Sequence, residues 1–263
     1  MRHITPFGFI ALCFLLFATG CSWFKDDVTI VDNVEPEFNL DLVEKLDAPF
    51  KPIQIRVATL KEQNCKATIH NNAFRNGRTI LFNINQWSAN EPCTDELKIR
   101  DTLITIDVLT PGTYDLKVRI ATDLYSDGTL TVTPDRYLFE CKKPLGFVIE
   151  RTEMLRIPDD LVWGYIAFTN SKFGSDADQL VQEMAAMNKE ANIKSGNYGH
   201  FVMENRNTIT LPTLTNNLPV TRTFVFQNEL SNEELSAWIK NLHEVYQGSI
   251  SLSLTNSQGA TWN

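Results

Sequence analysis

The sequence predicts a mixed β and α+β chain in which a β-sandwich domain, residues 53–155, precedes an α+β domain, residues 156–263. Three observations predict this division. Short runs of alternating apolar and polar residues follow one another up to about Glu153, and turn residues separate them. Two runs with helical periodicity come next, and strand-like segments enclose each of them. The change of pattern between the two kinds of region falls near residues 151–158.

The predicted sandwich strands are short and regularly spaced. Turn dipeptides separate them at Asn76-Gly77, Pro111-Gly112 and Asp127-Gly128, and we expect the last of these to form a hairpin turn. Short alternating strands at this spacing are typical of β-sandwiches. The expected strands cover residues 53–57, 79–84, 103–108, 114–120, 130–133, 137–139 and 146–149.

Residues 109–118 carry a more specific pattern. Their sequence, Leu-Thr-Pro-Gly-Thr-Tyr-Asp-Leu-Lys-Val, resembles the L-x-P-G-x-Y-x-L-x-V edge of prealbumin-like and fibronectin-like sandwiches. The resemblance implies an immunoglobulin-like or prealbumin-like sandwich, with a turn at Pro111-Gly112 and Tyr114 packed at the sandwich corner. Because many unrelated functions share such folds, the resemblance says little about function.

The second domain is predicted to have the element order β-α-β-β-α-β. Its first helix begins near Ser175, and its second begins with a capping box formed by Ser231 and Glu234. The apolar residues at helical spacing are Leu180, Met184, Met187 and Ala191, followed by Leu235, Trp238, Ile239, Leu242 and Tyr246. The expected strands cover residues 162–168, 198–203 with its continuation 207–211 after a kink, 221–226 and 249–254. This order is the split-βαβ, ferredoxin-like arrangement.

Residues 1–20 have the layout of a secretory signal peptide. A short basic start precedes an apolar run that ends at Phe17, and small residues stand directly before Cys21. This stretch resembles a bacterial lipobox with Ala18 in place of the usual Leu. The resemblance implies that Cys21 is lipidated and anchors the protein to a membrane, and Ser22 favours the outer membrane, as in Gram-negative lipoproteins. The alternatives are a secretory signal with an incidental cysteine and an uncut anchor.

Residues 21–52 are predicted to form an acidic tether between the anchor and the folded domains. The segment contains three prolines and little periodicity. Like charges and prolines keep such a segment extended. Residues 28–31, Val-Thr-Ile-Val, are alternatively a first edge strand.

The formal net charge of −8 argues against nucleic acid or anionic lipid as a partner bound by charge. Three cysteines follow Cys21, and disulfides are permitted outside the inner membrane. We expect a bridge between Cys65 and Cys93, worth about 3 kcal/mol, with Cys141 left over. The alternative is three buried free thiols. We expect no metal site, because no CxxC pair or nearby histidine completes a zinc set.

Several polar pairs begin a chemical motif without completing it. His243-Glu244 lies on the second predicted helix, but Gln247 stands where a zinc protease has its second histidine. Residues 123–128 lack the alternating ligands of a calcium loop. No nucleophile elbow accompanies His70 or His200. We therefore expect no enzyme activity and no cofactor.

A contact surface is the remaining kind of candidate site. Trp87 lies in a polar segment, residues 85–90, where we expect it to be exposed, and exposed Trp is enriched at interfaces. Leu214 and Leu218 lie in the long connection 212–220, which is a candidate contact loop.

These observations favour a non-enzymatic outer-membrane lipoprotein. It would act as a protein–protein interaction or assembly subunit of an envelope complex, such as a secretion, pilus or transport system, with a protein partner whose identity the sequence does not give. The alternative hypothesis is a surface lipoprotein that binds a glycan or small ligand through Trp87 and the sandwich loops. An envelope hydrolase is a third and less favoured interpretation.

Overall fold

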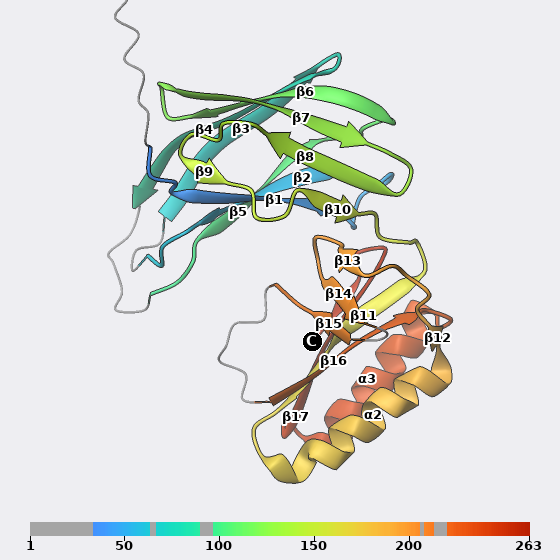
Figure 1. The fold of residues 1–263 in the computed structure, drawn as a ribbon. Helices are drawn as coiled ribbons and strands as arrows, with labels where there is room; N and C mark the ends of the chain where they lie inside the picture. Colours follow the sequence, from blue (N-terminus) through green and yellow to red (C-terminus); the bar gives the residue numbers. More distant parts are fainter. Residues whose placement is uncertain (1–33, 64–66, 90–96, 206–207, 213–219) are drawn as a thin grey trace, which may run out of the picture. The chain divides into compact units, whose positions relative to one another are not determined.

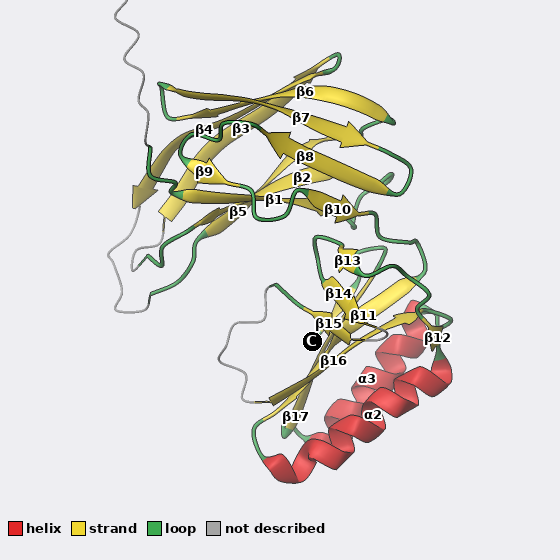
Figure 2. Cartoon of the chain, in the orientation of Figure 1, coloured by secondary structure: helices red, strands yellow, loops and turns green. Residues whose placement is uncertain are grey.

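A computed structural model describes residues 34–63, 67–89, 97–205, 208–212 and 220–263 (Figure 1). Glu35–Asn263 forms one compact unit. The described residues are mostly strands and contain two α-helices, which confirms the prediction of a β-rich fold (Figure 2).

Two sheets make up the first half of the unit and share one hydrophobic core. The four-stranded sheet has the order β5 (Asp101–Asp107), β2 (Ile53–Thr59), β1 (Phe38–Glu44) and β9 (Phe147–Val148). The six-stranded sheet has the order β10 (Glu153–Leu155), β8 (Arg136–Cys141), β7 (Leu124–Val132), β6 (Gly112–Ile120), β4 (Thr79–Ala89) and β3 (Ala67–Asn76). Their common core includes Leu40, Ile55, Phe82 and Phe139, all fully buried. Side chains from both sheets therefore pack against one another in a sandwich-like manner.

The tether expected over residues 21–52 is wrong at residues 38–44, which form strand β1. Residues 38–44 pair with β2 in antiparallel register, from Phe38 opposite Thr59 to Glu44 opposite Ile53. Phe38 and Leu42 are buried in the sandwich core, as the period of two in a strand requires. Because acidic residues stand between the apolar ones, the sequence indicated a tether here instead of a strand. Residues 21–33, including the alternative strand 28–31, lie outside the described residues.

The turn residues have different outcomes. Gly77 adopts a positive φ of 58° between β3 and β4, as expected of a hairpin. The expected hairpin turn at Asp127-Gly128 is wrong, because both residues lie within β7, where Gly128 pairs with Leu116 and Cys141. A Cβ at Gly128 would lie 2.5 Å from the backbone oxygen of Glu140, so this glycine permits close strand packing rather than a turn.

Tyr114 is buried, as the 109–118 pattern implies. Its hydroxyl donates to the backbone oxygen of Thr110 at 2.9 Å. The partner lies four residues upstream, at the entry to β6, so the bond ties the turn to the strand. Such a bond satisfies the one polar atom of an otherwise apolar side chain.

The second half of the unit contains a five-stranded sheet with a helical layer. Its strand order is β12 (Lys189–Glu190), β16 (Val220–Gln227), β11 (Leu161–Phe168), β17 (Ile250–Asn256) and β18 (Thr261–Trp262), and all neighbours are antiparallel. A short 3-10 helix, η1 (Ser171–Phe173), leads into α2 (Gly174–Met187), and α3 (Asn232–Tyr246) joins β16 to β17. Both helices lie on one side of this sheet (Figure 2).

The helix signals of the sequence are confirmed for α3. Ser231 Oγ accepts from the Glu234 amide at 3.2 Å, and the Glu234 carboxylate accepts from the Ser231 amide at 2.8 Å. Leu235, Ile239 and Leu242 are buried against the sheet. The capping box therefore begins the helix where the sequence indicates.

Helix α2 ends four residues earlier than Ala191, the last position of its predicted apolar series. Asn188 ends it by donating to the Met184 carbonyl at 2.9 Å. The strands expected over 198–203 and 207–211 do not join the five-stranded sheet. They contribute to a separate sheet of β13 (Gly196–Asn197), β14 (Val202–Asn205) and β15 (Thr208–Thr210). The strand beside β16 is instead β12.

The three-stranded sheet covers the face of the five-stranded sheet that the helices leave open. Val162 and Ile166 of β11 pack with the helices, whereas Trp163 packs with Phe201 and Met203. Because side chains alternate along a strand, these two groups lie on opposite faces of β11. The central strand β11 is thus buried on both faces.

Candidate functional site at the junction of the two halves

A buried carboxylate lies at the end of β1, where the two halves of the unit meet. Glu44 is 1% exposed. Its Oε1 accepts from the Tyr137 hydroxyl and from Arg156 Nε, both at 3.2 Å, and its Oε2 accepts from the Ile157 amide at 3.0 Å. We call these four residues the Glu44 cluster. They join β1 and β8 of the sandwich to the segment that leads into β11.

In the Glu44 cluster, the negative charge of the carboxylate is balanced by the Arg156 guanidinium and by two further hydrogen-bond donors. The Arg156 guanidinium lies over the Tyr137 ring, 5.2 Å from its centroid. Burial raises the pKa of Tyr137, and the negative charge of Glu44 adds to this shift. The hydroxyl therefore stays protonated and remains a donor to the carboxylate. A buried charge with three donors is far less costly than an unpaired one.

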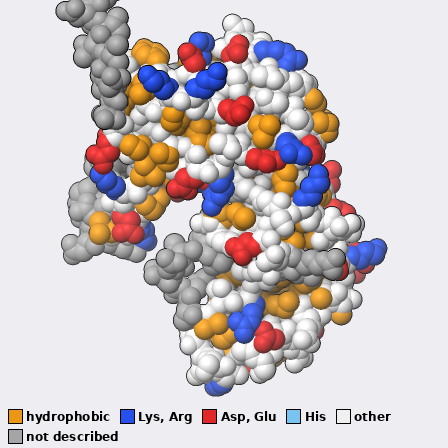
Figure 3. All heavy atoms as spheres, viewed as in Figure 1, with side chains coloured by type: hydrophobic (Ala, Val, Ile, Leu, Met, Phe, Trp, Pro, Cys, Tyr) orange, Lys and Arg blue, Asp and Glu red, His pale blue; other side chains and the backbone are white. Residues whose placement is uncertain are grey.

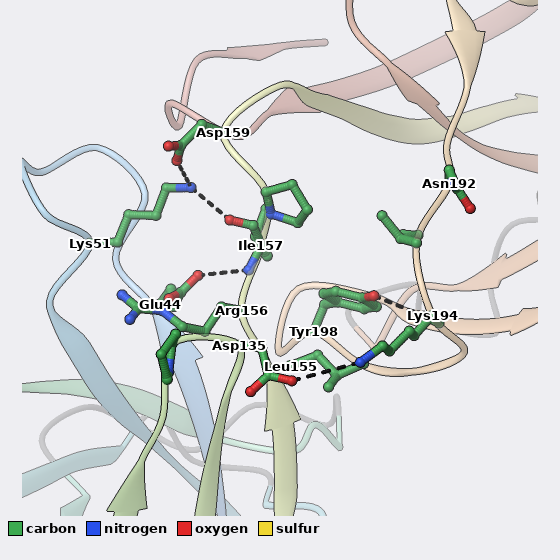
Figure 4. Close-up of a pocket in the computed structure, with 13 residues that line it drawn as sticks. Glu44, Lys51, Asp135, Leu155, Arg156, Ile157, Asp159, Asn192, Lys194 and Tyr198 are labelled. Carbon is green, nitrogen blue, oxygen red and sulfur yellow. Dashed lines mark hydrogen bonds and ion pairs between the residues drawn. The ribbon is translucent and has the colours of Figure 1, made fainter. Parts of the chain in front are cut away.

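Further contacts fix the same junction. Lys51 Nζ donates to the Ile157 carbonyl at 2.9 Å and to Asp159 Oδ1 at 2.7 Å (Figure 4). The His200 Nε2 lies 2.7 Å from the Glu44 carbonyl oxygen. Gly199 has a positive φ of 78°, and a Cβ there would lie 2.9 Å from the Leu42 carbonyl oxygen. The β13–β14 connection therefore approaches β1 at a distance that only glycine allows.

A cavity of about 450 Å³ opens at this junction (Figure 4). Leu155, Ile157, Ile193 and Pro158 contribute apolar surface, and Tyr198 donates its hydroxyl proton to the Lys194 carbonyl at 2.9 Å. Charged side chains complete the lining, which includes Lys51, Arg156, Lys194, Glu44, Asp135 and Asp159. The volume is within the usual range of ligand sites, but charged side chains are at least as numerous in the lining as apolar ones.

The donors of this junction cavity are less fully used than its acceptors. All three donors of the Glu44 cluster point at one carboxylate. Hydrogen bonds from Thr133 and Arg136 lower the pKa of Asp135 to about 2, and Lys194 Nζ lies 3.7 Å from it. Among the described residues, nothing accepts a hydrogen bond from the Arg156 Nη atoms. In the close-up, the Arg156 guanidinium extends past Glu44, whereas the Lys194 ammonium lies beside Asp135 (Figure 4).

Burial also shifts the pKa of Tyr198, to about 12. Its phenol accordingly stays neutral and keeps its bond to the Lys194 carbonyl. This bond holds the chain at Lys194 against the cavity wall.

A second buried carboxylate lies on the opposite face of β1. Asp41 is 9% exposed, and its Oδ2 accepts from Arg151 Nη1 at 3.2 Å. Its Oδ1 and the Arg56 Nε have no hydrogen-bond partner among the described residues. Burial raises the pKa of Asp41, although the charges of Arg151 and Arg56 oppose the shift. We call Asp41, Arg56 and Arg151 the Asp41 group.

His200 lies beside this group and contacts β1. Burial lowers its pKa, the charge of Arg56 lowers it further, and the bond to the Glu44 carbonyl opposes both effects. Its ring centroid lies 6.0 Å from that of Trp163. Ser195, the nearby hydroxyl in the sequence, donates to the Glu204 carbonyl at 3.2 Å. The structure thus gives His200 a packing role at the junction.

Most of the sequence-predicted site residues fall outside the described part of the chain. These are Cys21, Cys65, Cys93, Leu214 and Leu218, so the lipidation, the disulfide and the contact loop stay predictions. Trp87 lies within β4, opposite Ile69 of β3, and the exposure expected of its side chain stays a prediction. Cys141 is a free, half-buried thiol whose pKa is raised by burial.

Trp262 and His243 both have hydrogen-bond partners. Trp262 Nε1 donates to Ser236 Oγ of α3 at 2.8 Å, so the indole packs on the helix. The His243 carbonyl accepts the Gln247 amide at the end of α3. Within the described ranges, no cluster of three His, Cys, Asp or Glu side chains has a geometry that could hold a metal ion. None of the helices there has the length and apolar character to cross a bilayer.

The Glu44 cluster was missed because its members are far apart in sequence. Glu44 and Arg156 are separated by 112 positions, and Glu44 and Tyr137 by 93. One local signal was present. In the run Phe38, Leu40, Leu42, Glu44, the glutamate occupies the apolar phase of the strand. A charge at such a position indicates a buried pair.

On the face of the molecule seen in Figure 3, acidic and basic side chains are interspersed. Comparisons of the chain with family models, with curated proteins and with solved structures found no match.

Proposed function

We propose that this protein is a membrane-anchored lipoprotein of the bacterial outer membrane and acts as a non-enzymatic binding or assembly subunit of an envelope complex. The stretch Phe17-Ala-Thr-Gly-Cys21 supports the location, because a cysteine after small residues and an apolar run resembles a lipobox. A lipid anchor at Cys21 with additional acyl chains would hold the folded unit stably at the membrane.

The junction cavity is the observation that carries the binding role. Its lining comes from both halves of the unit and rests on elements fixed by the Glu44 cluster and by Lys51. A site on rigid elements needs little reorganisation when a partner binds, so it loses less free energy to ordering. We propose that the envelope partner contacts the protein here.

We also propose finer fold assignments. The order β12-β16-β11-β17, with helices after β11 and β16, supports a ferredoxin-like second half that carries β13–β15 as an insertion. The pattern at residues 109–118, with its buried Tyr114, supports an immunoglobulin-like or prealbumin-like sandwich. Such modules often dock other proteins, which is an argument from fold analogy.

The test combines localisation with crosslinking in intact cells. A photo-crosslinking residue is introduced at Asn192, an exposed residue of the cavity wall, and as a matched control at Asn76, an exposed residue at the β3–β4 turn. The intact mass and membrane fractionation of the native protein are compared with those of Cys21→Ala.

We expect lipidation in the native protein only, an outer-membrane location, and one crosslinked partner from position 192 that position 76 does not capture. An unlipidated soluble protein that crosslinks to nothing from position 192 would overturn the proposal.

A further inference from the structure

We propose that the open edge of strand β17 binds an extended peptide segment of a partner protein as an added antiparallel strand. The segment would lie beside residues 250–253 and place apolar side chains against α3. This inference goes beyond the function proposed above, because it assigns a second surface that shares no residue with the junction cavity.

Strand β17 is paired along its whole length on one side but only at one end on the other. On the first side, β11 pairs with residues 250–256. On the second side, β18 pairs with Leu254 and Thr255, and no described strand lies beside residues 250–253. An unpaired strand edge presents amide and carbonyl groups at the spacing that another strand requires.

Two hydrogen bonds at the end of β17 show which residues face which side. The Asn256 amide donates toward the β18 side, to the Ala260 carbonyl at 3.0 Å. The next amide, that of Ser257, donates toward β11, to the Leu161 carbonyl at 2.9 Å. Successive residues of a strand direct their backbone groups to opposite sides, so even-numbered residues of β17 face the β18 side.

The same alternation identifies the backbone groups of the open edge. Leu252 and Ile250 direct their N–H and C=O groups to the side on which β17 has no described partner. Ser251 and Ser253 direct theirs to β11. The open edge therefore offers two amides and two carbonyls in the pattern of an antiparallel ladder.

The sequence of β17 lacks the residues that usually protect a sheet edge. Charged residues and prolines prevent unwanted pairing at such edges. Other edges of this protein carry charges, since β5 begins with Asp101 and ends with Asp107, and β12 consists of Lys189–Glu190. β17 reads Ile-Ser-Leu-Ser-Leu-Thr-Asn and contains neither kind of residue. Its open edge is therefore suited to pairing with another strand.

Helix α3 runs beside β17 in the opposite direction. Asn232, at the start of α3, accepts from Asn256 Nδ2 at 3.0 Å, and residues 247–249 connect the end of α3 to the start of β17. Trp262 of β18 packs near the start of α3, where its Nε1 donates to Ser236 Oγ at 2.8 Å. An added strand collinear with β18 would therefore pass the later turns of α3.

A shallow groove of about 540 Å³ lies along this path. Its lining consists of Ser236, Ile239, Lys240, His243 and Glu244 of α3, together with Thr261, Trp262 and Asn263. Leu252 is buried on the helix side of the sheet, and directly opposite residues of antiparallel strands point to the same face. A partner residue opposite Leu252 would therefore enter the groove, as Trp262 does opposite Leu254.

The groove fits an apolar side chain at that position. Ile239, the Trp262 ring and the hydrocarbon stem of Lys240 supply apolar surface. Lys240 and Glu244 carry opposite charges, so the groove does not require a charged partner residue. In strand addition the main chain supplies affinity, and pockets for alternate side chains supply specificity. The occupant is therefore an extended segment with alternating apolar and polar residues.

Titration of the full chain with the peptide acetyl-Lys-Thr-Val-Thr-Val-Thr-Lys-amide, followed by NMR, tests the inference. One matched control is N-methylated at both valines, whose amides would face β17, and a second is N-methylated at two threonines, whose amides would face away. We expect at least about tenfold weaker binding for the first, because it loses its donors to the edge. The second should bind within about threefold of the parent peptide, because its bonded amides are intact.

Hydrogen exchange in the same samples locates the peptide. In the free protein we expect the Leu252 amide to exchange at least about tenfold faster than the amides of Ser251 and Ser253, which bond β11. Saturation with the parent peptide should slow exchange at Leu252 and leave the two serine amides unchanged.

A chain extended after Asn263 by Val-Thr-Val-Thr would fill the edge from within, because its valines fall opposite Leu252 and Ile250. The matched control extension, Pro-Thr-Pro-Thr, has the same length but no amide donors at these positions. We expect the first extension to weaken peptide binding at least about tenfold and the second to leave it unchanged.

Three results would overturn the inference: no binding of the parent peptide, equal binding of the two methylated peptides, or a Leu252 amide already protected in the free protein. In the last case, sedimentation shows what covers the edge, a second copy in a dimer or another part of the chain in a monomer. None of these results depends on lipidation or on crosslinking from position 192, so the function proposed above is tested separately.

Discussion

Strand β1 carries two buried carboxylates on opposite faces, and the two differ in how fully they are hydrogen-bonded. Glu44 has three donors for its two oxygens, and these donors come from two segments of the junction, strand β8 and residues 156–157. Asp41, three positions earlier, has one bonded oxygen, and its Oδ1 has no partner among the described residues. Both are nearly inaccessible to solvent.

The difference shows that burial alone does not define the role of a charged group. A carboxylate whose donors belong to other segments stabilises the arrangement of those segments. A carboxylate that is buried with incomplete pairing favours its neutral form, as the raised pKa of Asp41 indicates. We therefore expect substitutions of Glu44 and Asp41 to have effects of different size and sign.

The largest effect is expected for Glu44→Ala. This change leaves Arg156, the Tyr137 hydroxyl and the Ile157 amide without their common acceptor. Breaking a buried pair on one side costs about 3–5 kcal/mol, so the free energy of unfolding in urea should fall by that amount. The control is Glu35→Ala, which removes an exposed pair with Lys61 and should leave the urea midpoint unchanged. Similar midpoints for the two variants would refute the role given to Glu44.

Tyr137→Phe is expected to have the next largest effect. It removes one donor to Glu44 without changing the shape of the ring or its contact with the Arg156 guanidinium. Hydrogen bonds to charged groups contribute about 1.5–3 kcal/mol, so unfolding should become easier by about 2 kcal/mol. Tyr114→Phe is the matched control for a tyrosine that bonds a neutral carbonyl, and its loss should be smaller. A larger loss for Tyr114→Phe than for Tyr137→Phe would show that the charge of Glu44 adds nothing to the hydrogen bond from Tyr137.

Asp41→Asn should lie within about 1 kcal/mol of the unsubstituted protein at pH 7, with the variant the more stable. The pKa of Asp41 is raised in the folded state above its ordinary 3.8. Its contribution to stability is therefore complete below pH 3.8 and decreases as the pH rises through the folded pKa. Urea unfolding at pH 3.5, 5 and 7 should show the unsubstituted protein losing stability relative to the variant. A relative gain with rising pH would mean that Arg151 and Arg56 pair Asp41 fully.

His200→Gln tests the smallest effect, a pH slope of opposite direction. Burial lowers the pKa of His200 from its ordinary 6.5, so the stability that depends on its neutral form is present above pH 6.5 and decreases as the pH falls below it. Thermal unfolding at pH 7.5 and 5 should show a larger decrease in Tm for the unsubstituted protein than for the variant. Equal decreases would show that the junction does not require neutral His200.

The sequence predicted the elements whose signals are local. Alternation identified β2, β6, β11 and β17, and the capping box identified the start of α3. These signals depend on neighbouring residues, so they survive without knowledge of the tertiary structure. The prediction of a hairpin at Asp127-Gly128 failed because the same dipeptide also fits within a continuous strand. Gly128 is needed there for close packing against β8.

The candidate site could not be predicted in this way. Its residues come from the end of β1 and the connection after it, the turn before β8, the segment from β10 to β11, and residues 192–198 between α2 and β16. Only the fold brings them together, and no spacing in the sequence records the contact between Glu44 and Arg156. Asn188 is an equally inconspicuous residue in the sequence. It ends α2, and residues 189–211 can therefore form β12–β15.

Hydrogen exchange of the Ile157 amide, followed by NMR, tests directly whether Glu44 stabilises the junction, because this amide donates to Glu44 Oε2. We expect this amide to exchange as slowly as the amides of β1 in the unsubstituted protein and in Asp41→Asn. In Glu44→Ala its protection should fall by more than that of the Val118 amide in β6, which reports the change in overall stability. An Ile157 amide that exchanges at the rate of an exposed loop in the unsubstituted protein, or that follows Val118 in Glu44→Ala, would contradict the account.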